Sequence, residues 1–346
     1  MKRIIMVLLL AAMFATTAKA QELTAPTVPP KAEKFMPETT NNFLNGILEV
    51  IWDALAAIRP DLRTACGVCL RIATVIMGLS LLRTFPGASQ RTCNLAGTVG
   101  ISLILLESTG SLVNLAATTV TEVSEYGKLL LPVMTAALSA QGSITSSASL
   151  YVLTAFFNAF LSGIIGKLLT PMIFLFLLTA AANSAIGEET LKKLRDSIKW
   201  IVTWTLKTIL YIYTGFISIT GVVSGTTDAA ALKAAKLTIS SVVPVVGGIL
   251  SDASEAVLVS AGTIKNTAGI YGFFAIIAIW IGPFLQIGVH YLLSKATGVL
   301  CAVFGSKEHT DLIQDFSSAM GLLLAMTGAI CLMLLISLVC YLRGVG

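Results

Sequence analysis

Residues 316–342, FSSAMGLLLAMTGAICLMLLISLVCYL, decide the fold: all 27 positions are uncharged, and the run ends at Arg343. An α-helix of about 20 apolar residues spans the hydrocarbon core of a bilayer. Backbone polar groups in lipid must be paired within helices or closed barrels, and a barrel strand would alternate apolar with polar residues. The unbroken run therefore predicts a transmembrane helix and an all-α fold.

The composition of the whole chain supports the same prediction. Of the 346 residues, 55% are apolar and only 12% are charged, and the mean hydropathy is +0.87. Soluble domains carry about 25% charged residues. The low charge excludes an ordinary soluble enzyme and a disordered chain, and it favours one polytopic helical membrane protein.

Other uncharged runs predict further membrane helices. The strongest predicted spans are 150–166, 168–187, 208–225, 268–293 and 318–342. Only Lys167 separates the first two, and Gly163, Gly166 and Pro171 are breakers that predict the turn of a helical hairpin there. The stretch 108–121 is rich in Ser, Thr and Ala, so it is ambiguous.

The N-terminus predicts a cleavable signal peptide at residues 1–20. Lys2 and Arg3 precede an apolar stretch of twelve residues, and Ala18-Lys19-Ala20 fits the small-x-small cleavage pattern. An uncleaved anchor is the alternative, although the stretch is short for a span. Cleavage lowers the net charge from +5 to +2, which is too small for nucleic-acid binding.

The region after the signal peptide divides into three predicted parts. Residues 21–40 contain four prolines and predict an exported linker, and 41–60 predict an amphipathic helix that ends at Arg59-Pro60. The multi-span membrane domain is then 61–346. Within it, residues 188–199 form the densest basic cluster, which predicts a charged cytoplasmic loop.

A candidate pathway site follows Pro244, Gly247 and Gly248, where Asp252 and Glu255 are spaced to share one face of a helix. A broken helix at membrane depth lines a protein-enclosed or wet cavity, and carboxylates there mark an ion or substrate path. The favoured alternative is an interfacial helix with solvated carboxylates.

Lys207 is a second candidate pathway residue. It continues a helical stripe that begins with Trp200 and Trp204 and ends at Tyr211. The favoured interpretation is an aromatic belt at the membrane interface with a snorkelling lysine.

Sequence motifs of enzymes are absent. The chain contains no phosphate-binding G-x-x-x-x-G-K-[ST] loop, no dinucleotide fingerprint, no G-x-S-x-G elbow and no HExxH zinc pair. We therefore expect no catalytic residues, cofactor or metal. If the protein moves a substrate, the energy comes from a partner or a gradient.

The segment from Thr227 to Gly272, which includes TDAAALKAAKLTISSVVPVVGGILSDASEAV, resembles the stage III sporulation protein AE family. The similarity covers about residues 127–346 and includes Leu130-Leu131-Pro132 and the terminal Arg343-Gly344. The resemblance implies a multi-pass protein in the mother-cell membrane that surrounds the forespore. Members join a secretion-like channel complex that supports late forespore gene expression.

The partners implied by this resemblance are the other stage III sporulation A proteins with their secretion-type ATPase, a forespore-side channel partner and a YidC-type insertase. The lipid bilayer is the surrounding solvent, and nucleic acid is not expected to bind. The alternative function is an independent transporter or permease that uses Asp252 and Glu255 in a broken-helix site.

Overall fold

The computed structural model describes residues 26–37, 43–82, 84–85, 89–140, 144–219 and 267–343. Helices and their connections make up these residues, with no strand among them. Within these described ranges, five helical segments are long and apolar enough to cross a membrane. The predicted class, an all-α helical membrane protein, is confirmed. The predicted signal peptide lies outside the described residues.

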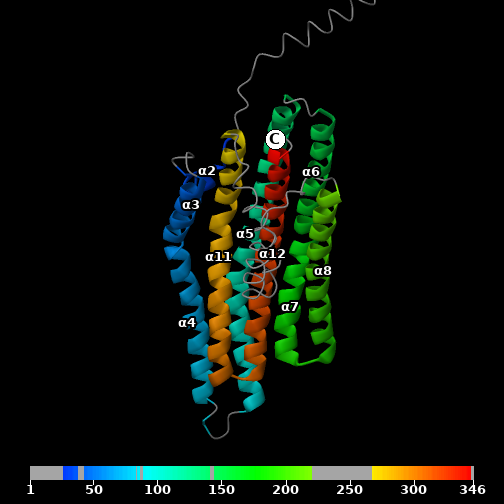
Figure 1. Ribbon diagram of the computed structural model, residues 1–346. Helices are drawn as coiled ribbons and strands as arrows, with labels where there is room; N and C mark the ends of the chain where they lie inside the picture. The colour runs from blue at the N-terminus through cyan, green and yellow to red at the C-terminus, as the bar shows by residue number, and fades with distance from the viewer. Residues whose placement is uncertain are drawn as a thin grey trace, which may run out of the picture.

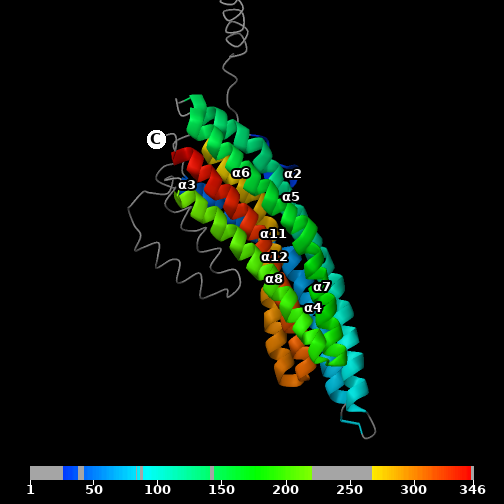
Figure 2. The same ribbon diagram turned by 90° about the vertical axis from the view of Figure 1, so that its right-hand side faces the viewer.

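The described helices form an elongated bundle (Figures 1 and 2). In chain order they are α2 (Pro30–Glu33), α3 (Phe43–Ala57), α4 (Arg59–Leu82), α5 (Gln90–Ala140), α6 (Ile144–Ile164), the π-helix η1 (Ile165–Leu169), α7 (Thr170–Ile186), α8 (Glu189–Ile219), α11 (Thr267–Phe304) and α12 (Lys307–Arg343). The ends of α4, α7 and α11 and the starts of α5, α8 and α12 lie at one end of the bundle, and the end of α5 and the start of α6 lie at the other (Figure 1).

Helix α12 is the centre of the bundle. It packs against α5, α6, α7, α8 and α11, and 94% of its most apolar window is buried, against 28–56% in the other candidate spans. A helix enclosed on all sides must be apolar on all sides. The continuous run at 316–342 is therefore explained by burial in protein and not by contact with lipid.

The predicted hairpin between 150–166 and 168–187 is wrong. Helix α6, η1 and α7 form one rod without a reversal of the chain. Pro171 has no N–H to donate, which interrupts the α-helical ladder, and the wider turn of η1 carries the chain past this point. The Thr170 hydroxyl donates to the Ile165 carbonyl five residues earlier, at 2.9 Å.

The predicted charged loop at 188–199 is also wrong, because most of it forms the first turns of α8. The chain reverses instead at Gly187, which has a φ of 78°. Buried Ile198, Val202 and Leu206 mark the inner face of α8. The described part of the predicted span 208–225 forms the end of α8. Helix α8 is amphipathic and is not among the five candidate spans.

Close approach between helices depends on small residues such as Gly127 of α5. A Cβ atom there would lie 2.9 Å from Leu334 Cδ1 of α12 and 3.0 Å from Asn158 Nδ2 of α6. The Asn158 amide also donates to the Ser124 carbonyl at 3.1 Å. Gly127 is therefore a point where three helices meet.

We expect Gly127→Val to destabilise the bundle by about 1–3 kcal/mol, because the larger side chain overpacks this junction. Gly110→Val is the matched control on the same helix, since no neighbouring atom lies within 4 Å of a Cβ there. Thermal unfolding of the detergent-solubilised protein measures the difference. Equal unfolding midpoints for the two variants would contradict the packing described.

Candidate functional site

The site residues predicted from the sequence are only partly within the described structure. Pro244, Gly247, Gly248, Asp252 and Glu255 lie outside the described residues, so their predicted role remains a prediction. Lys207 is exposed on the outer face of α8.

The aromatic residues of the Lys207 stripe are also on the surface. Trp204 is 55% exposed and Tyr211 is 69% exposed. The rings of Trp200 and Trp204 stack with their centroids 6.0 Å apart. The structure therefore places Lys207 in an outward-facing stripe and not in the bundle interior.

A second polar surface lies on α5. Between residues 107 and 128 every exposed residue of this helix is polar, and the spacing alternates between four and three. The members of this α5 polar face are Glu107, Ser111, Asn114, Thr118, Thr121, Glu125 and Lys128. At 1.5 Å per residue the face is about 32 Å long, close to the thickness of the hydrocarbon core, about 30 Å.

The other long helices expose apolar side chains instead. On α6 and α7 the exposed large residues include Val152, Phe156, Phe160, Leu175 and Leu178. Such side chains suit contact with lipid. The α5 polar face does not suit contact with lipid. Asn114 and Thr118 have no hydrogen-bonding partner among the described residues, and an unpaired amide or hydroxyl group is costly in hydrocarbon. This face requires water or another polar surface.

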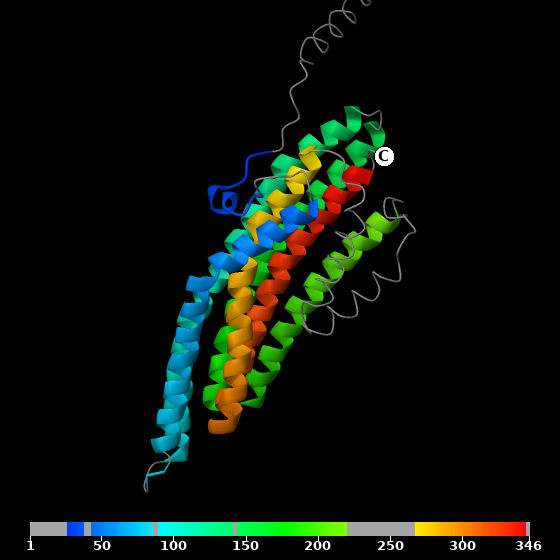
Figure 3. The same cartoon turned by 60° about the vertical axis from the view of Figure 1, so that its left-hand side comes forward.

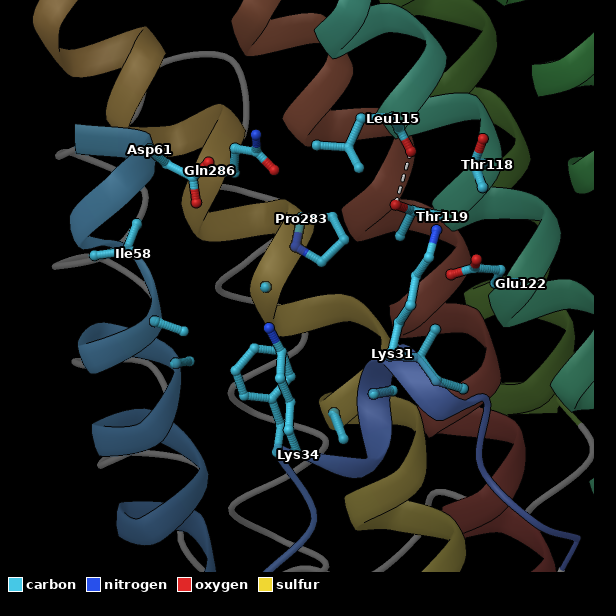
Figure 4. Close-up of a pocket in the computed structure, with 17 residues that line it drawn as sticks. Lys31, Lys34, Ile58, Asp61, Leu115, Thr118, Thr119, Glu122, Pro283 and Gln286 are labelled. Carbon is cyan, nitrogen blue, oxygen red and sulfur yellow. Dashed lines mark hydrogen bonds between the residues drawn. The ribbon is translucent and has the colours of Figure 1, made fainter. Parts of the chain in front are cut away.

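A cavity of about 310 Å³ lies beside the α5 polar face. It is lined by residues of α2, the α3–α4 junction, α5 and α11 (Figure 4). These elements lie next to one another in the bundle (Figure 3). Its polar lining residues are Lys31, Lys34, Asp61, Thr118, Thr119, Glu122 and Gln286. Two ammonium groups and two carboxylates thus face one space, and Thr118 belongs both to the cavity and to the α5 polar face.

The charged groups of the cavity come from different elements. The Asp61 carboxylate of α4 lies next to the Gln286 side chain of α11, whose amide points away from Asp61, whereas Lys31 of α2 extends toward Thr119 and Glu122 of α5 (Figure 4). The Lys34 ammonium lies 4.6 Å from the centre of the Phe35 ring. Among the described residues, no ion pair within 4.0 Å joins these lysines to these carboxylates.

Pro283 interrupts the hydrogen-bond ladder of α11 beside the cavity. It lies inside α11 and lacks the N–H that would pair with the Ile279 carbonyl one turn earlier. Both Ile279 and Pro283 line the cavity. The Ile279 carbonyl therefore lacks its normal helical donor.

Helix α2 is held beside the cavity because Phe35 packs on Gly282 of α11. Phe35 is 6% exposed, and a Cβ at Gly282 would lie 3.0 Å from its ring. Glycine at position 282 therefore permits the close approach of the segment that carries Lys31 and Lys34.

Polar contacts also connect α8 to α12. Arg195 donates to Asp315 at 2.7 Å, with both side chains 13% exposed, and Lys199 donates to the Ser318 hydroxyl at 3.1 Å. Burial by itself lowers the pKa of Arg195, but Asp315 and Asp196 outweigh burial and raise that pKa above its ordinary value. The guanidinium therefore stays charged.

The described residues contain no candidate metal site. No group of three or more His, Cys, Asp and Glu side chains could hold a metal ion there. The residues gathered at the cavity are ammonium, carboxylate, amide and hydroxyl groups, which bind charged and polar ligands.

These features define a polytopic helical membrane protein with a polar outer helix face and a charged cavity. Within this class, the chain belongs to the stage III sporulation protein AE family, since the family profile "Stage III sporulation protein AE" matches residues 32–343. The resemblance predicted from the sequence is confirmed, and the match extends further toward the N-terminus than residue 127.

A curated relative is the Stage III sporulation protein AE of Bacillus subtilis (strain 168). It is 24% identical over 211 residues, which is 61% of this chain and 53% of the relative. The match therefore spans about half the length of that relative. No solved structure matches the chain.

We expect Gly282→Val to displace α2 from α11, because the added methyl groups collide with Phe35. The readout is labelling by a maleimide of a cysteine placed at Ala32, which is 5% exposed, in a variant without the native cysteines. Labelling should accelerate with Gly282→Val and stay slow with Gly288→Val, where a Cβ has no neighbour within 4 Å. Equal labelling rates in both variants would show that α2 is not held by this contact.

We expect Arg195→Gln to lower stability by about 1–3 kcal/mol, because Asp315 loses its partner in a largely buried position. Lys192→Gln is the control: its ion pair with Glu189 is 3.8 Å long and exposed, so its removal costs about 0–1 kcal/mol. Thermal unfolding in detergent measures both. A loss no larger for Arg195→Gln than for the control would refute the proposed role of the pair.

Proposed function

We propose that this protein is an integral membrane component of the secretion-like channel complex that links mother cell and forespore during sporulation. In this proposal it resides in the mother-cell membrane around the forespore and supports late forespore gene expression. Family membership supports the role in sporulation. The observation that carries the channel role is the α5 polar face.

A membrane protein contacts two solvents, the lipid acyl chains and water. Apolar residues on the outer faces of α6 and α7 suit lipid, but the α5 polar face cannot remain against acyl chains over about 32 Å. In the proposed complex this face lines an aqueous path or contacts a polar surface of another subunit. An isolated lipid-embedded monomer provides neither.

The distribution of charge supports an orientation for the bundle. Lys192, Lys193 and Lys199 lie near the α7–α8 turn, at the end of the bundle opposite the α5–α6 connection (Figure 1). Basic residues favour the cytoplasmic side. We therefore place the α7–α8 turn in the mother-cell cytoplasm and the segment that carries α2 toward the exported side.

The proposed partners would provide the covering surface, the assembly step and the energy source of the channel. The other stage III sporulation A proteins and a forespore-side partner would cover the α5 polar face and complete the channel, and a YidC-type insertase would assist membrane assembly. The secretion-type ATPase of the complex would supply energy. We propose no catalytic step for this chain.

A clean deletion of the gene should leave engulfment intact and arrest development soon afterwards, with loss of late forespore gene expression. Fluorescence microscopy of engulfment and a late forespore reporter measure both. Normal numbers of heat-resistant spores after deletion would contradict the proposed function.

The role of the α5 polar face is tested in a complementing copy that carries Asn114→Leu, Thr118→Leu and Thr121→Leu. The reporter should fall at least about tenfold while the membrane level of the protein is unchanged. The control replaces Val152, Phe156 and Phe160, on the exposed apolar face of α6, by Leu. Full complementation by the α5 triple variant would exclude an essential polar role for this face.

A further inference from the structure

We propose that the outer face of α8 around Lys207 is the docking surface for residues 237–264 of the same chain, and that the Glu255 carboxylate pairs there with the Lys207 ammonium. Residues 237–264, here called the acidic stretch, lie outside the described residues. The inference rests on the membrane placement of the bundle. It goes beyond the channel role and does not depend on it.

Two contacts between α8 and α12 give the level of Lys207 in the bundle. Lys199 donates to the Ser318 hydroxyl at 3.1 Å, and Tyr213 donates to the Met333 carbonyl at 3.1 Å. Lys207 lies between these contacts, about 12 Å along α8 from Lys199 and about 9 Å from Tyr213. It is therefore level with the middle of the uncharged part of α12.

A lysine at this level cannot bring its charge to the membrane surface. The half-thickness of the hydrocarbon core is about 15 Å, which is much longer than a four-carbon lysine stem. Lys207 is exposed on the outside of α8, and none of the ion pairs among the described residues includes it. A charged group at membrane depth is costly unless a partner or a wet cavity receives it.

The rest of the outer surface of α8 is suited to an apolar partner. From residue 200 to residue 212, Lys207 is the one charged residue among the exposed positions. Its exposed neighbours include Trp204, Tyr211 and Ile212, and α8 packs on α7 and α12 with its opposite side. An apolar segment with a carboxylate near its middle would be complementary to this surface in both polarity and charge.

The acidic stretch has this composition. Between Lys236 and Lys265 the only charged residues are Asp252 and Glu255, and most of the others are Val, Ile, Leu, Ala, Gly and Ser. Small residues allow close packing between membrane segments, so they can receive the large side chains of α8. A carboxylate in such a stretch is itself costly in lipid, and pairing with Lys207 removes both costs.

The length of the chain permits the contact. Helix α8 ends at Ile219 and α11 begins at Thr267, and both of these points lie at the same end of the bundle (Figure 1). Lys207 is about 18 Å along α8 from Ile219. Glu255 precedes Thr267 by the same number of residues, which cover about 18 Å even at the short rise of a helix. Glu255 can therefore reach the level of Lys207.

The first test is carbodiimide cross-linking of the unmodified full-length protein in nanodiscs, so it does not depend on the folding of a variant. Dicyclohexylcarbodiimide enters the bilayer and activates a carboxylate, and the amine of a paired lysine then displaces the urea and forms an amide bond. Mass spectrometry should identify an amide between Lys207 and Glu255. A mixture of unlabelled and isotope-labelled protein should show that the link forms within one chain.

The ion pair of Lys128 with Glu125, at 2.6 Å on α5, is the positive control for the chemistry. Cross-linking of that pair without any link at Lys207 would overturn the proposal. So would a link between two copies, which would assign the surface to a second protein molecule, or a link of Glu255 to Lys167, the exposed lysine of η1.

A charge exchange then measures the coupling by chemical denaturation in detergent. Lys207→Glu should lower the ratio of folded to unfolded protein at least about fivefold, because two carboxylates then meet, and Glu255→Lys in the same chain should restore it. Lys193→Glu, at an exposed position near the start of α8, is the control that Glu255→Lys should not rescue. Purely additive effects of Lys207→Glu and Glu255→Lys would contradict the contact, since residues in contact are coupled.

Discussion

The enclosure of α12 by its neighbours is the constraint on which the rest of the structure depends. A transmembrane helix that faced lipid on one side could carry small or polar residues on the other. Residues 316–342 of α12 are instead uncharged on every side, and α5, α7 and α11 all pack against this helix. The remaining helices are therefore an outer layer, and each of them has one face on α12 or its neighbours and one face outside.

That outer layer meets more than one environment. The outer faces of α6 and α7 are apolar, whereas α5 turns a polar face outward from Glu107 to Lys128. The cavity beside this face places charges from α2, α4 and α5 around one space. One side of the bundle is thus built for lipid, and another side is built for water and polar ligands.

The sequence was sufficient for the fold class because uninterrupted apolar runs are a strong signal. The predicted turn near Pro171 was wrong. A proline interrupts the helical hydrogen bonds both where a chain reverses and where a helix continues through a π-turn, so the sequence did not distinguish the two. It also misassigned residues 188–199, which form a helix: Lys192 and Lys193 lie on its exposed side, whereas Arg195 pairs with Asp315 of α12. The α5 polar face was detectable from its spacing of four and three. The cavity was not, because Lys31, Asp61, Glu122 and Gln286 are far apart along the chain.

The most direct test of this arrangement is photolabelling of the protein in a bilayer by an apolar carbene precursor, with adducts mapped by mass spectrometry. Adducts should form on the exposed residues of α4, α6 and α7, including Met77, Phe156 and Leu175. They should be absent from residues 316–342 and from the α5 polar face. Labelling along 316–342 as strong as that on α7 would contradict the central position of α12.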